Sequence, residues 1–162
     1  MKTRYLLLLV APLCMAEEAV ITGNVQSKCV INVDTYGVYG NPTVDKLSTA
    51  PADGGVNPII RFDVAVGNSY TARLTTPTDF SSSPVLNDVV NWTGSTSVKE
   101  FSDAAMSDID SNKVEYNATS EFDLHTAGTI WFKVDSTAEY GYGKALPGGT
   151  YTAIVQADCI AN

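Results

Sequence analysis

The chain has 162 residues, of which 44% are hydrophobic and 17% are charged, with 18 Asp and Glu against 10 Lys and Arg. This length suits one domain with a single core. The net charge of −8 repels phosphate backbones and no basic cluster interrupts it, so neither nucleic acid nor an anionic membrane surface is an expected partner.

Residues 1–16 have the pattern of a secretory signal peptide: a start with two basic residues, an apolar run over residues 5–13, and a small residue at Ala16. The apolar run is shorter than the roughly 20 residues that span a bilayer. We therefore expect cleavage after Ala16, export, and no transmembrane segment in the mature chain. A lipid-modified Cys14 is the alternative, but bulky Leu13 precedes it where a small residue is expected.

The first mature segment alternates in character from Ile21 to Val33, with Gly23, Val25, Cys29 and Ile31 in the same register. A period of two is typical of a half-buried strand, because successive side chains point to opposite faces of a sheet. The sequence therefore predicts a strand here.

The middle of the chain contains short β-prone runs separated by turn residues. A turn-rich stretch covers residues 36–55, and alternating runs on either side of Gly67-Asn68 predict a hairpin. Further strands are expected at the following places: residues 85–92, 95–101, 114–118 and 130–135. Residues 101–109 suit one or two helical turns capped by Ser102. Seven or eight short strands without a long helical pattern predict an all-β protein, a β-sandwich.

The final strand is expected from Tyr151 to Cys159, after the turn Pro147-Gly148-Gly149. Signal removal leaves two cysteines, Cys29 and Cys159, and an even count in an exported chain predicts one disulfide between them. The alternative is two separately buried thiols. A bridge needs Cα atoms about 5.5 Å apart, so the two cysteines would lie on adjacent strands or stack across two sheets.

Catalytic residues are scarce. The single histidine, His125, lies in a predicted strand, where a packed or exposed side chain is far more common than a catalytic base. No Gly-x-Ser-x-Gly elbow is present, and with the cysteines paired a zinc site lacks ligands. We expect no enzyme and no cofactor.

A weak metal candidate lies at Asp108, Asp110 and Asn112, which place oxygen ligands at every second position, as at the start of a calcium loop. Lys113 stands where such a loop needs glycine, and Thr119 where it needs a bidentate glutamate. The alternative is a solvated acidic turn, and we expect no metal.

Aromatic residues offer a second candidate for ligand recognition. Tyr140 and Tyr142 alternate with Gly141 and Gly143, and together with Trp131 they could stack on sugar rings. The alternative is that these side chains pack the loop against the sandwich.

Three stretches carry a resemblance to a known family. They are the run from Ala19 to Val25, the final run from Pro147 to Val155, and a central patch made of residues 90–94, Lys99 to Phe101 and Ala104-Ala105. Their order, behind a signal peptide, resembles that of pilin subunits assembled by the chaperone-usher route.

The resemblance implies an immunoglobulin-like sandwich that lacks its own last strand, so that a groove is left open. A periplasmic chaperone would fill the groove first, and the N-terminal extension of the next subunit would replace it. On this basis residues 17–26 form the extension, with donor residues Ala19, Ile21, Gly23 and Val25, and residues 27–162 form the domain. Partners would be copies of the chain or other pilus subunits, with an outer-membrane usher during assembly.

The expected function is therefore a structural subunit of a bacterial surface pilus, which supports adhesion and passes through the periplasm to the cell surface. The alternative is a self-complete secreted sandwich that binds carbohydrate or calcium. The cysteines bear on this choice, because a bridge between adjacent first and last strands would close the groove at that point.

Overall fold

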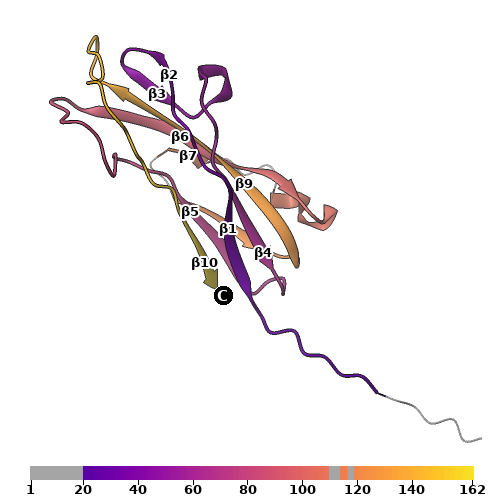
Figure 1. Cartoon of the computed structure of the whole chain (residues 1–162). Helices are drawn as coiled ribbons and strands as arrows, with labels where there is room; N and C mark the ends of the chain where they lie inside the picture. Colours follow the sequence, from indigo (N-terminus) through magenta and orange to yellow (C-terminus); the bar gives the residue numbers. More distant parts are fainter. Residues whose placement is uncertain (1–19, 110–113, 117–118) are drawn as a thin grey trace, which may run out of the picture.

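The computed structural model describes residues 20–109, 114–116 and 119–162, so the predicted signal peptide and Ala19 lie outside it. The described part contains ten strands and two short 3-10 helices (Figure 1). The strands are β1 (Cys29–Thr35), β2 (Gly40–Thr43), β3 (Lys46–Ser48), β4 (Ile59–Val64), β5 (Tyr70–Thr75), β6 (Val90–Phe101), β7 (Val114–Glu115), β8 (Thr119–Leu124), β9 (Gly128–Tyr140) and β10 (Gln156–Ala161). The helices are η1 (Pro51–Asp53) and η2 (Ala104–Ile109).

The strands form two antiparallel sheets. In the seven-stranded sheet the long strand β9 pairs with β6 along one edge, and with β4 and then β3 along the other. Strands β1, β2 and β7 lie outside β4, β3 and β6 respectively. The second sheet has the order β10-β5-β8. Strands β1 and β10 are therefore edge strands of different sheets.

The core lies between the two sheets and follows the alternation of the strands. Burial in β8 alternates residue by residue, and the inward side of β9 is buried from Ile130 to Tyr140. Phe122 of β8 packs against Phe132 of β9 with ring centroids 4.6 Å apart, and Phe62 of β4 meets Phe132 edge to face. Side chains of both sheets thus fill one core, and the predicted all-β sandwich is confirmed.

The second layer changes character at the end of the molecule that carries the β2–β3 turn. Here the three-stranded sheet stops, and the coil before β6 and the coil after β9 cover the larger sheet (Figure 1). Phe80 joins the layers, with its ring 4.7 Å from that of Trp92 and 5.0 Å from that of Tyr151. Aromatic side chains in coil therefore replace strand pairing as the cover of this half.

The predicted hairpin at Gly67-Asn68 is wrong. Strand β4 pairs with β1 and β9, whereas β5 pairs with β10 and β8. The turn takes the chain from one sheet to the other, with Asn68 at φ 59° donating its amide to the Leu124 carbonyl (2.7 Å). Both strands bury one face in the shared core. Two strands of a hairpin would show the same alternating pattern, so the pattern alone does not distinguish the two arrangements.

Two other local predictions need correction. The strands expected at residues 85–92 and 95–101 are one strand, β6, which begins only at Val90. A side chain at Gly94 would lie 2.1 Å from the Asp135 carbonyl, so this glycine permits close approach to β9 instead of ending a strand. Ser102 is not the residue that caps the helical turn η2, as its hydroxyl accepts a hydrogen bond from the Thr129 amide of β9 instead. The side chain of Asp103 accepts the Ala105 amide at the start of η2.

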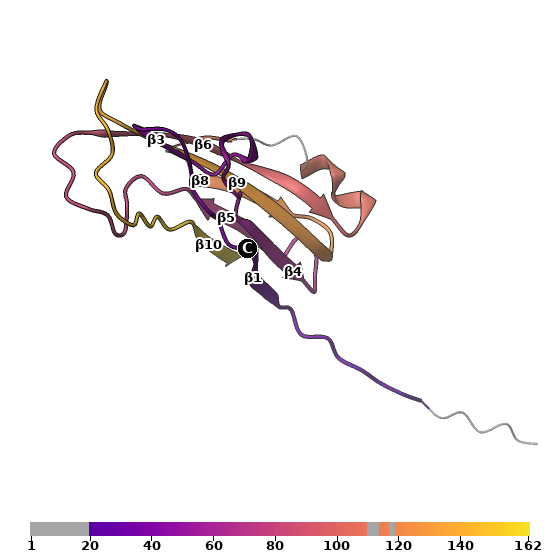
Figure 2. The same cartoon turned by 45° about the horizontal axis from the view of Figure 1, so that its top comes forward.

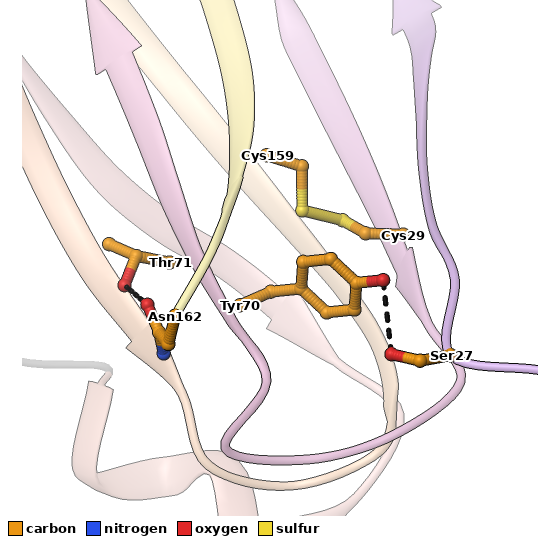
Figure 3. Close-up of a disulfide and its surroundings, with 6 residues drawn as sticks. All are labelled: Ser27, Cys29, Tyr70, Thr71, Cys159 and Asn162. Atoms are coloured by element: carbon orange, nitrogen blue, oxygen red, sulfur yellow. Dashed lines mark hydrogen bonds between the residues drawn. A yellow bond between two sulfur atoms is a disulfide. The ribbon is translucent and has the colours of Figure 1, made fainter.

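The terminal strands are shorter than the alternation suggested. Pairing begins at Cys29 instead of Ile21, and the last strand begins at Gln156 instead of Tyr151. Cys29 and Cys159 form the predicted disulfide, with Cα atoms 6.4 Å apart (Figure 3). The bridge joins the two sheets instead of neighbouring strands, so of the two arrangements considered it is the stacked one that occurs.

In the described residues, no helix has the length and apolar character needed to cross a bilayer.

Candidate functional site

A groove of about 670 Å³ runs along the open side of the sandwich. One wall is the chain from Val33 to Tyr39, at and beyond the end of β1, and the other is the coil from Gly149 to Val155 that leads into β10. The floor comes from the larger sheet and its connections, through Leu47, Thr49, Pro58, Ile60, Pro77 and Ser136. The two walls lie far apart in sequence and on different layers.

The lining is apolar and uncharged. It contains no Asp, Glu, Lys, Arg or His side chain, and its polar side chains are hydroxyls. The Tyr39 hydroxyl lies 2.9 Å from Ser136 Oγ, and burial raises the pKa of Tyr39 although this hydrogen bond opposes the shift. Such a lining suits an uncharged, largely apolar occupant.

Both walls present main-chain groups to the groove. Val38 exchanges both of its backbone hydrogen bonds with Val56, and Thr152 does the same with Ser82. In extended chain, successive residues direct their amide groups to opposite sides. Gly37 and Ala153 therefore point theirs the other way, and within the described part of the chain neither has a backbone partner. The groove thus lies between two unpaired edges.

The disulfide lies beyond one end of the groove, whose lining stops at Val33 and Val155. The first wall continues β1 back to Cys29, and the second continues through β10 to Cys159, so the walls converge on the bridge. Ser27 donates a hydrogen bond to the Tyr70 hydroxyl at this same end (3.1 Å; Figure 3). The opposite end, near Tyr39 and Gly149, has no covalent cross-link in the described residues, although the Phe80 ring packs against both Tyr39 and Tyr151.

The N-terminal segment Val20 to Lys28 leaves the domain at the disulfide end, and we call it the tail. Its base lies against the domain, where the Ala65 amide donates to the Lys28 carbonyl (2.9 Å) and Val25, Gln26 and Lys28 line a second cavity beside β4. Residues 20–24 have no strand partner in their own chain and extend away from both sheets (Figures 1 and 2). The apolar side chains of the tail are exposed: 82% for Val20, 96% for Ile21 and 77% for Val25. Exposed apolar side chains grouped on one short extended segment indicate an interaction segment.

The predicted donor residues fall on this tail. Ile21, Gly23 and Val25 are all exposed, and a Cβ added at Gly23 would meet nothing within 4 Å. Their side chains do not enter the groove of their own chain. The fourth, Ala19, lies outside the described residues.

The aromatic residues considered for sugar binding do not come together. Tyr140 is buried, and its hydroxyl accepts the Asn87 amide at 3.0 Å. Tyr142 is fully exposed beyond the end of β9. Trp131 lies nine residues before Tyr140 on the same strand, and its indole donates to Asp34 at 2.6 Å. An odd separation along a strand places these two side chains on opposite faces.

The remaining candidates give no assembled site. His125 is exposed, with Nδ1 3.0 Å from the Asn68 side-chain oxygen. Asp110 and Asn112 lie outside the described residues, as does the side chain of Asp108. Among the residues that are described, no three His, Cys, Asp or Glu side chains gather as metal ligands would.

Comparisons of the chain with protein-family models, with curated proteins and with solved structures gave no match. The interpretation of the groove and the tail therefore depends on their geometry alone.

The sequence pointed to the tail but not to the groove walls. Residues 36–39 belong to the stretch interpreted as turn-rich, and residues 151–155 were assigned to the last strand. One residue of the first wall, Gly37, is a glycine for a structural reason. A Cβ at this position would lie 2.9 Å from the Pro58 ring, because the wall passes close to the floor of the groove here.

Proposed function

We propose that this protein is a structural subunit of a bacterial surface pilus, and that copies join when the tail of one enters the groove of another. In this proposal the sandwich is immunoglobulin-like and incomplete, and the tail supplies the missing strand. The single observation that carries it is that one chain has both an apolar groove between two unpaired edges and an exposed apolar tail whose residues 20–24 pair with no strand of their own chain.

The two parts fit each other in chemistry. The tail contains no charged residue between Val20 and Gln26, and the groove lining contains none either. Burial of a side chain the size of Ile21 or Val25 contributes about 1.5–3 kcal/mol. The inserted strand would also pair its main chain with Gly37 on one side and Ala153 on the other, as in strand addition to a sheet edge.

Insertion into a neighbour is favoured over insertion into the same chain. The tail continues β1 outward from Cys29, whereas the groove follows β1 in the opposite direction (Figure 1). To reach its own groove the tail would have to reverse direction beside the disulfide and the Ser27–Tyr70 hydrogen bond. A contact between a tail and a different surface is heterologous, so it repeats and builds an open fibre.

The open end of the groove sets the direction of the incoming strand. The bridge closes the end near Cys29, so the chain that connects the strand to its own domain passes out beside Tyr39 and Gly149. The inserted strand then runs alongside β1 in the same direction and antiparallel to the wall from Gly149 to Val155. The next domain follows at the open end.

An isolated subunit would expose this groove to aggregation. The proposal therefore includes a periplasmic chaperone that covers the groove after export, an outer-membrane usher that exchanges it for the next tail, and a final place on the cell surface. Adhesion through the assembled fibre belongs to the same proposal. No described residue cluster favours the alternative binding module.

A peptide of residues 17–26 added to a mature chain that starts at Ser27 tests the proposal. Because a ligand stabilises only the folded state, we expect a higher melting temperature, with about 2.7 kcal/mol gained at a peptide concentration 100 times its dissociation constant. A control peptide with aspartate in place of both Ile21 and Val25 should give no shift. Equal melting curves with and without the native peptide would contradict insertion.

A further inference from the structure

The tail and both groove walls meet at a single covalent junction. The tail ends at Lys28, and the next residue is Cys29. The first wall reaches Cys29 along β1, and the second reaches Cys159 along β10. The bridge between the two cysteines therefore ties the place where a strand would be held to the place where the subunit's own tail leaves.

Without the bridge no covalent link and no strand pairing joins the two walls, which then meet only through side-chain packing, such as that of Tyr39 and Tyr151 on Phe80. Strand β1 pairs with β4 alone and β10 with β5 alone, and these pairs belong to different sheets. No hydrogen-bond ladder joins β1 to β10 in the described residues. A pull on the second wall would then reach the tail only through noncovalent contacts, namely β5, the core, the Thr152–Ser82 hydrogen bonds and the Phe80 ring. Strand β10 could peel from β5, its single strand partner.

From this arrangement we infer that the Cys29–Cys159 disulfide is a tension-bearing link, which passes pulling force from the second groove wall directly to the tail, to which the first wall is already joined through the backbone of β1. The inference rests on the proposed function, because force reaches the walls through an inserted strand. In a fibre under load the inserted strand pulls the walls toward the open end, while the subunit's own tail is pulled the other way. Strands β1 and β10 then share the load along their lengths.

The inference has a measurable consequence for the rest of the domain. The bridge closes a loop with a sequence separation of 130 residues, and the chain between the two walls lies inside that loop. With the bridge intact, unfolding of strands β2 to β9 adds no length to the fibre, because force bypasses them. Without it, force held by the second wall can draw out the whole loop, which is roughly 44 nm of extended chain.

Pulling on single assembled fibres tests the link. The double variant Cys29→Ser/Cys159→Ser should lengthen by up to roughly 40 nm per subunit before neighbouring subunits part, or part at a lower force, whereas the oxidised native fibre should part without lengthening. If the double variant fails to fold, native fibres assembled first and then treated with a phosphine reductant give the same comparison.

A matched control separates load-bearing from general stability. Leu124, on β8, is fully buried in the core against which both cysteines pack, so Leu124→Ala weakens the core around the bridge while leaving the bridge itself in place. Even if Leu124→Ala lowers the melting temperature as much as the double variant does, fibres of Leu124→Ala should still part without lengthening. Equal loss of force in both variants, with no lengthening in either, would overturn the inference. Absence of fibres from the native protein would instead contradict the proposed function.

Discussion

At the scale of single residues, the tail divides into side chains that would enter a groove and side chains that would remain in solvent. Ile21 belongs to the first set and its neighbour Thr22 to the second, because successive residues of a strand face opposite ways. Both are exposed in the free subunit, so substitution of either should leave the fold unchanged. The pair therefore isolates the effect on assembly.

We expect Ile21→Asp in the full mature chain to abolish fibres and Thr22→Asp to retain them. An unpaired carboxylate placed in an uncharged groove costs about 3 kcal/mol or more, which weakens insertion at least 100-fold. Size-exclusion chromatography and electron microscopy of the two variants check this. Fibres of equal length from both would show that the face containing Ile21 is not the inserted one.

A second residue-scale feature is the buried hydroxyl of Tyr116, beneath the coil-covered half of the sandwich. Burial raises the pKa of Tyr116 well above its ordinary value, and the nearby Ser136 and Thr76 hydroxyls counteract this only in part. No hydrogen bond of good geometry reaches the Tyr116 hydroxyl. The folded state therefore strongly prefers the neutral phenol.

This preference predicts loss of stability in alkali. The folded pKa lies above the unfolded value of about 10, so the stabilisation is complete below pH 10 and is lost as the pH rises beyond it. Each pH unit above 10 should cost about 1.4 kcal/mol through this residue, until the folded pKa is reached. Tyr116→Phe should melt close to the native protein at pH 8 and above it at pH 11. A constant difference between the two melting temperatures from pH 8 to pH 11 would contradict the assignment.

At the scale of elements, alternation predicted which segments are extended but not which sheet each joins. The runs around Gly67-Asn68 have the pattern of a hairpin, yet β4 and β5 join different sheets because each buries one face in the same core. A period of two reports a buried face and says nothing about the hydrogen-bonded neighbour. Pairing is a long-range property, and a single sequence contains little information about it.

The ends of strands show a related limit. The first and last runs alternate well beyond their paired portions, so the tail and the wall from Tyr151 to Val155 both looked like strand. An apolar alternating segment that awaits a partner has the same pattern as one already paired. The sequence therefore predicted the tail, the disulfide and the sandwich. It did not predict the groove, because the groove exists only where the chain beyond β1 and the chain before β10 lie apart in space.

At the scale of the whole molecule, the groove and the tail extend in opposite directions from the Cys29–Cys159 disulfide. The lining of the groove follows the chain beyond β1 and before β10, away from the disulfide. The tail continues β1 in the other direction, toward solvent (Figure 2). A domain with the groove on one side of the disulfide and the tail on the other suits end-to-end assembly. Under the proposed function, two unpaired edges in each subunit would give rise to a polymer.

The most direct test of this account is a structure of an assembled oligomer by electron cryomicroscopy. It should show residues 20–25 of one copy between residues 33–39 and residues 149–155 of the next, with the inserted strand running in the same direction as β1. A groove that is empty in the oligomer, or one filled by the tail of its own chain, would contradict the account.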